Sequence, residues 1–387
     1  MTARIDPQFL TEFKKYGVVN VEKCFNCGNC TAVCPLSTDS ETFPRRLIRY
    51  AQLGLKDQLL SSKELWLCYS CGECTQTCPQ QADPGEFMAT ARRYAIASYD
   101  PLGLAKLLYK SPILSSIFFV LLALVIGLGV YSVHGPMPTG TLRLFDFIPS
   151  SVIHTFGVVG MVVVGLLILM GMVNMILKVR GQGMKGVHTN WRNAIWEAVA
   201  VEVLAQRRFQ RDCEAATDKS AWYLQKWFVH ASILWGFLGL LLATALDYLL
   251  GLLGIKATGT WVPFWNPIRL LGTLAGLFLV YGTTVSLIRR FRKTDTTTAH
   301  STVSDWAFLI FLWLTGVSGF LLEIAVYLPH PAPWMYWTLV CHITVAAELL
   351  LLLPFTKFSH ALYRTIALYF HALKPIPVTE PAKAGTD

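Results

Sequence analysis

Charged residues are scarce in this sequence. Asp, Glu, Lys and Arg make up 15% of the 387 residues and hydrophobic residues make up 53%, whereas about a quarter of the residues in a soluble globular protein are charged. The shortage is uneven, because residues 1–110 carry thirteen basic and eleven acidic residues and long uncharged runs dominate from Ser111 onward. We therefore expect a soluble domain at 1–110, a membrane domain at 111–372 and a polar, Pro-rich, disordered tail at 373–387.

The absence of other sequence motifs limits which cofactors this chain is expected to bind. No C-x-x-C-H motif occurs, which excludes covalent c-type haem attachment. No Rossmann unit, a strand followed by G-x-G-x-x-G and a helix, is predicted, so we expect flavin and nicotinamide to bind to other chains. No signal peptide is visible ahead of the soluble domain, which we expect to stay in the cytoplasm. The formal charge of +9 lies mainly in loops of the membrane half, where a lipid bilayer explains it better than nucleic acid does.

Eight of the ten cysteines form two copies of one pattern, CFNCGNCTAVCP at Cys24–Pro35 and CYSCGECTQTCP at Cys68–Pro79. In the spacing C-x2-C-x2-C-x3-C-P, three thiolates bind one 4Fe–4S cluster and the fourth binds the other cluster. Zinc usually takes two separated pairs of ligands and disulfides need an oxidising compartment, so these alternatives fit less well. We assign cluster one to Cys24, Cys27, Cys30 and Cys78, and cluster two to Cys68, Cys71, Cys74 and Cys34.

Six apolar runs are long enough to cross roughly 30 Å of hydrocarbon. They lie near 112–131, 149–177, 227–250, 268–288, 303–328 and 334–358. The loops 178–226 and 289–300 hold nine and four basic residues, and the three opposite loops hold three between them. The positive-inside rule then places the cluster domain and both termini in the cytoplasm, on the inner side of the cytoplasmic membrane.

Two further segments have helical spacing of apolar residues. The first, Phe43–Leu60, carries Arg45, Arg46 and Arg49, which form either a docking face or an ordinary solvated face. The second, Asn190–Asp212, lies either in the membrane interface or under the cluster domain as its floor.

Four histidines lie in or beside the spans, where a histidine needs a partner. A polar bridge between helices is one interpretation, and haem ligation is the other. His342 and His360 are 18 residues apart, which is five turns or about 27 Å along one face of a single helix. His230 opens the third span at the depth of His360, and His154 opens the second at the depth of His342. We therefore predict an inner b-type haem between His230 and His360, and an outer one between His154 and His342.

Charged residues near the spans supply further candidates. The basic residues at the inner rim either pair with haem propionates or anchor the interface; they are Lys226, Arg289, Arg290 and Lys357. Acidic residues in spans mark proton or substrate paths; here they are Asp247, Glu323 and Glu348. Glu348 lies about 240° around the helix from His342, and it is our candidate for a quinone or proton path. No other catalytic residue is assigned.

The order of these parts resembles known redox proteins. The cysteine patterns resemble the C subunit of heterodisulfide reductase. The membrane half is similar to the E subunit of that enzyme and to the cytochrome b gamma subunit of nitrate reductase, in the His342–His360 spacing and in EVLAQRRFQRDC at Glu202–Cys213. The fusion of both halves resembles the membrane-spanning C subunit of the quinone-interacting membrane-bound oxidoreductase complexes. One position departs from the cytochrome pattern, since Leu240 stands where that family has a second histidine; the outer haem then uses His154 or is absent.

The resemblance implies a mainly α fold, in which a helical dicluster ferredoxin-like domain is fused to a six-helix transmembrane cytochrome b bundle. It implies electron transfer between menaquinone and soluble flavin and iron–sulfur subunits similar to the A subunit of heterodisulfide reductase, linked to adenylylsulfate reductase. The alternative is a membrane-anchored heterodisulfide reductase. That enzyme often carries CCG-type cysteine runs, and none occurs here.

Overall fold

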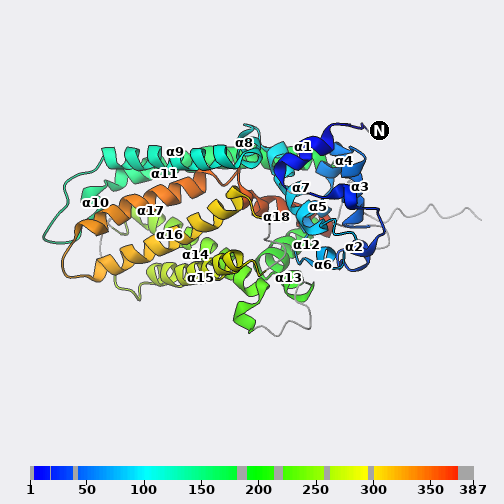
Figure 1. The fold of residues 1–387 in the computed structure, drawn as a ribbon. Helices are drawn as coiled ribbons and strands as arrows, with labels where there is room; N and C mark the ends of the chain where they lie inside the picture. Colours follow the sequence, from blue (N-terminus) through cyan, green and yellow to red (C-terminus); the bar gives the residue numbers. More distant parts are fainter. Residues whose placement is uncertain are drawn as a thin grey trace, which may run out of the picture.

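The computed structural model describes residues 4–17, 19–37, 42–180, 190–212, 221–256, 262–294 and 300–373. Within these ranges, all regular secondary structure is helical. The molecule is elongated, with a bundle of long helices at one end and a head of short helices at the other (Figure 1). The prediction of a mainly α protein is confirmed.

The head is built from the N-terminal residues. Its helices are α1 (Phe9–Phe13), α2 (Asn29–Ala32), α3 (Arg45–Gln52), α4 (Lys56–Ser61), α5 (Glu64–Leu67), α6 (Glu73–Gln76), α7 (Pro84–Tyr99) and α8 (Leu104–Lys110). Fully buried aromatic side chains, among them Phe9, Phe13, Phe87 and Trp66, form its core. The core is therefore held by large apolar side chains as well as by the cysteine loops.

The predicted single helix at Phe43–Leu60 is wrong. Two helices, α3 and α4, occupy this stretch. Gly54 between them has a φ of +68°, and its carbonyl accepts a hydrogen bond of 2.9 Å from the Asp6 amide. A Cβ at this glycine would lie 2.4 Å from the Asp6 carbonyl oxygen, so the turn is fixed by close approach to the N-terminal segment.

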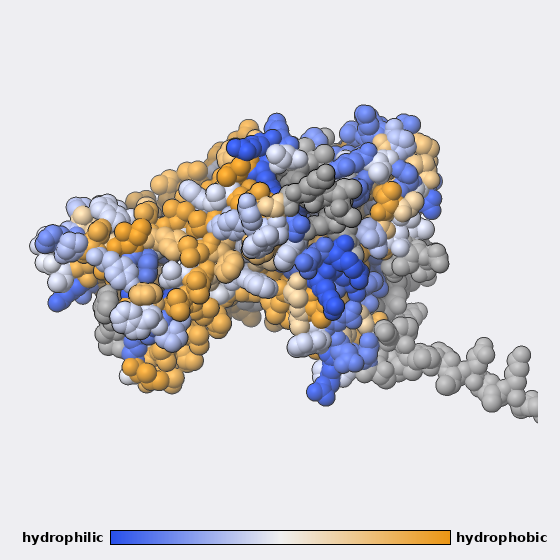
Figure 2. All heavy atoms as spheres, turned by 90° about the horizontal axis from the view of Figure 1, so that it is seen from below, coloured by the Kyte–Doolittle hydropathy of each residue, from blue (hydrophilic) through white to orange (hydrophobic). Residues whose placement is uncertain are grey.

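Six long helices form the bundle. They are α9 (Pro112–Ser132), α11 (Ser150–Arg180), α14 (Lys226–Leu252), α15 (Pro267–Arg292), α16 (Val303–Tyr327) and α17 (Pro333–Leu351). All six are long and apolar enough to cross a membrane, as the sequence predicted. Figure 2 shows apolar side chains spread over the bundle and hydrophilic ones gathered towards the two ends. These features indicate a multi-pass membrane protein.

The last predicted span is shorter than expected. Helix α17 ends at Leu351, and α18 (His360–Ala372) begins after a turn and the short helix η6 (Lys357–Ser359). Pro354 lies in the turn, and proline disfavours helix continuation because it lacks an amide hydrogen and crowds the preceding turn. His342 and His360 are therefore on different helices, and the predicted alignment along one face of a single helix is wrong.

Helix α18 lies at the junction of bundle and head (Figure 1). The side chains of Tyr363, Ile366, Ala367 and Phe370 are buried there. The ring of Tyr363 contacts Trp66 and Tyr99 of the head, at centroid distances of 5.1 and 5.2 Å. Aromatic packing of this kind holds α18 against the head.

The segment after α11 also lies against the head. It consists of α12 (Trp191–Trp196), a π-helix named η3 (Glu197–Leu204) and α13 (Arg207–Asp212). The Tyr69 ring stacks on Phe209 at 5.6 Å, and its hydroxyl donates to Glu202 Oε2 at 3.4 Å. This arrangement matches the floor interpretation. The predicted tail from Lys374, as well as Cys213, lies outside the described residues.

Candidate functional site

The two cysteine loops repeat one backbone conformation. Asn26 and Ser70 have φ values of 65° and 58°, and Gly28 and Gly72 have φ values of 92° and 95°. Each glycine precedes a short helix, α2 or α6. The side-chain amide of Asn29 in α2 donates to the backbone carbonyl of Thr77, directly after α6, and so links the two loops. Left-handed backbone at matched positions lets each loop curl around its own centre, as the sequence predicted for Gly28 and Gly72.

The cysteines fall into two groups across the loops. The thiol of Cys30 has Cys24, Cys27 and Cys78 as electrostatic neighbours. The thiol of Cys74 has Cys68, Cys71 and Cys34 among its neighbours. In each group, three cysteines come from one loop and the fourth comes from the other, which is the exchange that the motif predicts.

None of the eight cysteines in these groups forms a disulfide. Burial, with a smaller contribution from the neighbouring cysteine thiols, raises the pKa of Cys30 to about 11 and that of Cys34 to about 12. Insertion of iron must therefore displace protons from the sulfurs. Within the described ranges, no three His, Cys, Asp or Glu side chains converge closely enough for one metal ion. The residues fit a cubane, whose corners need more widely spaced thiolates.

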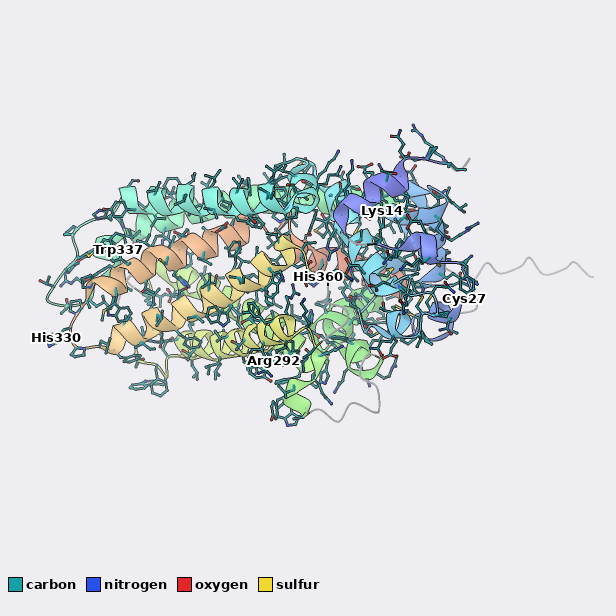
Figure 3. All side chains as sticks on the ribbon, in the orientation of Figure 1. Lys14, Cys27, Arg292, His330, Trp337 and His360 are labelled. Carbon is teal, nitrogen blue, oxygen red and sulfur yellow. The ribbon has the colours of Figure 1, made fainter. Side chains whose placement is uncertain are left out.

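The head presents the two groups differently. Cys27 is exposed and its neighbour Phe25 is 61% exposed, and Figure 3 places Cys27 on the side of the head away from His360. Cys34 and Cys68 pack at the edge of the hydrophobic core, as does Cys24 of the other group, and Cys30 is buried, so the difference lies at Cys27. The group of Cys27 therefore lies towards the outer face of the head.

His230 and His360 come together at the junction. Their ring centroids are 6.4 Å apart and the ring planes are inclined by 66°. The two imidazoles would hold the iron of a haem between them, each through one ring nitrogen. Their close approach across the junction supports this pairing.

Both rings are oriented by a hydrogen bond at Nδ1. His230 Nδ1 donates to Gln206 Oε1 at 3.1 Å, and His360 Nδ1 donates to the Lys357 carbonyl at 2.5 Å. Proton donation from Nδ1 leaves the lone pair on Nε2, the arrangement that an imidazole ligand needs. The donor set therefore fits a b-type haem.

The structure does not bring His154 and His342 together. The His154 ring contacts Tyr248 of α14 at 4.8 Å. His342 Nδ1 lies 2.8 Å from the Ser318 hydroxyl on α16. Among the described residues, these two histidine rings make no contact with each other. The outer pair stays a prediction.

A cluster of charges lies beside His360, with Arg93, Glu86 and Asp305 buried and Lys357 partly exposed. Arg93 of the head donates to Glu86 at 2.8 Å and to Asp305 at 3.0 Å. Lys357 forms an ion pair of 3.2 Å with Asp305. The guanidinium of Arg290 stacks over Trp306, and its buried Nε and Nη1 have no hydrogen-bond partner in the described structure. Of the predicted propionate partners, Arg290 is thus the one with buried donors that lack a partner among the described residues, whereas Arg289 donates to the Leu224 carbonyl.

The acidic candidates separate into two kinds. Asp247 pairs with Lys256, and Glu323 pairs with Arg269 at 2.9 Å, so both belong to ion pairs. Glu348 is 1% exposed, and its Oε1 has no hydrogen-bond partner in the described part of the chain. A buried carboxyl without a partner is costly, which makes Glu348 the one that calls for an explanation.

Sequence reasoning missed three polar groups of the site. Gln206 orients His230 and lies in the EVLAQRRFQRDC run, so that resemblance was a usable signal. Arg92 and Arg364 both donate to the Cys68 carbonyl, and no sequence pattern indicated these contacts.

The spacing G-x-G-x-x-G does occur once, at residues 181–186, but it follows the helix α11 instead of a strand and lies outside the described residues.

Comparisons with known proteins divide the chain in the same way. Residues 20–82 match the model of the 4Fe-4S dicluster domain. The C subunit of the H(2):CoB-CoM heterodisulfide,ferredoxin reductase of Methanothermobacter thermautotrophicus is 40% identical over 63 residues, which are 16% of this chain and 34% of that relative. The iron-sulfur C subunit of the CoB–CoM heterodisulfide reductase of Methanopyrus kandleri is 35% identical over 71 residues, 16% of this chain and 37% of the relative.

The chain also matches a second kind of protein. Citrate utilization protein B of Escherichia coli is 29% identical over 113 residues, 29% of each chain. The chain spans about a third of the length of these curated relatives. No solved structure matches it. The model of Citrate utilization protein B matches residues 104–376, well over half of the sequence, and the chain therefore belongs to the Citrate utilization protein B family.

Proposed function

We propose that this protein is the membrane subunit of a respiratory oxidoreductase that passes electrons between menaquinone and soluble partner subunits. The observation that carries the proposal is the 6.4 Å pairing of His230 and His360 directly beneath a head with two groups of cluster cysteines. When bound, a haem with two imidazole ligands and a 4Fe–4S cluster each exchange single electrons. The residues of the chain hold, orient and tune these groups.

The partner subunits are inferred from the similarity of the head. Its relatives are subunits of larger reductases by name, which supports assembly of this chain with further subunits. We propose that these carry flavin and iron–sulfur clusters, are similar to the A subunit of heterodisulfide reductase, and serve adenylylsulfate reductase. The exposed Phe25 and Cys27 offer them a contact surface next to a cluster. The chain is placed in the cytoplasmic membrane with both termini in the cytoplasm, in line with its basic loops.

Arg290 is proposed to bind a haem propionate. Its buried Nε and Nη1 lack partners in the described structure, and a carboxylate is the group that a guanidinium binds most strongly. Lys357 and Asp305 form an ion pair beside it, so one positive charge of the cluster is left over for an anion. An outer haem is proposed to use His154 and His342.

Glu348 is proposed to accept or supply the proton of the quinone. We expect Glu348→Gln to slow reduction of the protein by a menaquinol analogue about a hundredfold, the range of a lost general acid or base, with haem and cluster contents unchanged. The measurement is anaerobic stopped-flow spectroscopy. Asp247→Asn is the matched control, because Asp247 is a partly exposed carboxylate whose side chain is 52% exposed. Equal rates for Glu348→Gln and wild type would remove Glu348 from the quinone reaction.

A second candidate function is heterodisulfide reduction, because the cluster region is 40% identical to the C subunit of such an enzyme. In that case the purified complex would reduce a heterodisulfide without quinol. The membrane-subunit proposal expects quinol-dependent reduction of the clusters instead. Adding menaquinol analogue and heterodisulfide separately to the complex tells the two apart.

A further inference from the structure

The two cysteine groups are connected unequally to the membrane half. Helix α18 begins at His360 and carries Arg364 one turn later. Arg364 Nη1 donates to the carbonyls of Trp66, Leu67 and Cys68 at 2.8, 3.1 and 3.1 Å. One turn of helix therefore separates a histidine of the proposed haem site from a guanidinium bound to the backbone of a cluster cysteine.

A second connection leads to the same loop. The His230 ring contacts Phe209 at 5.7 Å, and Phe209 stacks on Tyr69 at 5.6 Å with planes inclined by 5°. Tyr69 directly follows Cys68 in the chain, and its ring also lies 4.5 Å from the Arg364 guanidinium. Both connections from the histidine pair thus end at Cys68 and Tyr69.

A second cation reinforces this contact. Arg92 of α7 donates to the Cys68 carbonyl at 3.1 Å and to the Ser70 hydroxyl at 2.7 Å. Two guanidinium groups therefore bind one cysteine carbonyl of cluster two. Cluster one has Arg45, which approaches Gly28 in its loop, and an exposed cysteine.

We propose that cluster two, held by Cys34, Cys68, Cys71 and Cys74, is the membrane-side cluster, and that Arg364 and Arg92 are positioning residues that raise its reduction potential. Reduction adds one negative charge to a cluster, and a nearby fixed cation in a low-dielectric site favours the reduced form. Arginine stays charged at every working pH, so the effect is permanent. Cluster one is then the exit to the soluble partner.

The electron order follows from this placement and rests on the proposed function. Each transfer moves a single electron, so the donor is oxidised by one unit and the receiving cluster is reduced by one unit, with no bond made or broken. A quinol supplies two electrons in succession and releases two protons. In this order, Cys34, Cys68, Cys71 and Cys74 would hold the cluster that takes each electron first. The other four cysteines would hold the cluster that supplies it to the soluble partner.

The test is a potentiometric titration of both clusters, followed by electron paramagnetic resonance, in the purified full-length protein. Arg364→Gln is expected to lower the midpoint potential of one cluster and leave that of the other unchanged. Arg92→Gln is expected to lower the midpoint potential of the same cluster as well. Arg143→Gln is the control, because the Arg143 side chain is 67% exposed and pairs with the nearby Asp146 at 3.6 Å; it is expected to move neither signal.

Two further variants sharpen the result. Arg364→Lys keeps the charge but loses the planar fork, and it is expected to shift the same cluster less than Arg364→Gln does. Arg45→Gln is expected to lower the potential of the other cluster, because Arg45 lies over the Gly28 loop. A shift of both clusters by equal amounts in Arg364→Gln would overturn the assignment. So would unchanged potentials in both Arg364→Gln and Arg92→Gln with full iron content.

The readout is independent of the haem. A protein without any haem spectrum would contradict the proposed function, yet its two cluster signals would still report the effects of Arg364 and Arg92. Conversely, a normal haem spectrum with Arg364→Gln and Arg92→Gln shifting different clusters would leave the proposed function intact and refute the assignment of cluster two.

Discussion

Replacing His360 by alanine is expected to abolish haem binding at the junction. The ring centroids of His360 and His230 are 6.4 Å apart, and each ring is held by a hydrogen bond at Nδ1. Loss of either ring would remove one of the two imidazoles that would hold the haem. The expected result for His360→Ala and for His230→Ala is loss of this haem from the reduced-minus-oxidised visible spectrum, with iron–sulfur content retained. The matched control is His330→Ala, an exposed loop histidine at the opposite end of the bundle (Figure 3).

A rescue experiment separates ligation from folding. The smaller variant His360→Gly leaves space for free imidazole, which is expected to restore the haem spectrum when added during reconstitution. Haem retained at wild-type content in both His360→Ala and His230→Ala would contradict the proposed ligand pair. A haem lost only on replacing His154 or His342 would place the site at the outer side of the bundle.

Neutralising Asp305 is expected to have the largest effect on stability. Its carboxylate is 3% exposed and pairs with Arg93 at 3.0 Å and with Lys357 at 3.2 Å. Asp305→Asn leaves Lys357 without its carboxylate and Arg93 with Glu86 alone, and breaking a buried ion pair such as Arg93–Asp305 on one side costs about 3–5 kcal/mol. We expect faster thermal inactivation and easier proteolytic release of the head, measured in detergent or nanodiscs by gel and by loss of cluster absorbance.

The control for Asp305 is Asp247→Asn, which removes a carboxylate from the pair with Lys256. The Asp247 side chain is 52% exposed, and an exposed pair contributes about 0–1 kcal/mol. Wild-type stability of Asp305→Asn would mean that the charge cluster does not hold the head on the bundle. Glu86 pairs with Arg93 on the side away from Asp305, and the loss of stability in Glu86→Gln is expected to lie between those of Asp305→Asn and Asp247→Asn.

Local patterns made much of this architecture predictable. The cysteine spacing predicts two 4Fe–4S clusters, and residues 20–82 match a 4Fe-4S dicluster domain; the exchange of the fourth ligands stays a prediction. Long uncharged runs predict the six bundle helices because each must carry enough apolar surface for a bilayer. Both patterns consist of residues close together in the sequence, so they can be recognised from the sequence alone.

Contacts between distant segments could not be predicted. The apolar run at 334–358 predicted one continuous last helix, which is wrong because α17 ends at Leu351 ahead of Pro354. His230 and His360 meet because a separate helix, α18, begins at the junction. The hydrogen bond from Arg364 to Cys68 joins residues 296 positions apart, and no local pattern encodes such a contact.

The most direct test of the account is the iron, sulfide and haem content of the purified wild-type protein, with a redox-titrated visible spectrum. Two 4Fe–4S clusters and at least one b-type haem per chain, reducible by a menaquinol analogue, are the expected result. Full cluster content without any haem absorbance would contradict the account and leave an iron–sulfur protein that is anchored in the membrane but not connected to quinone through a haem.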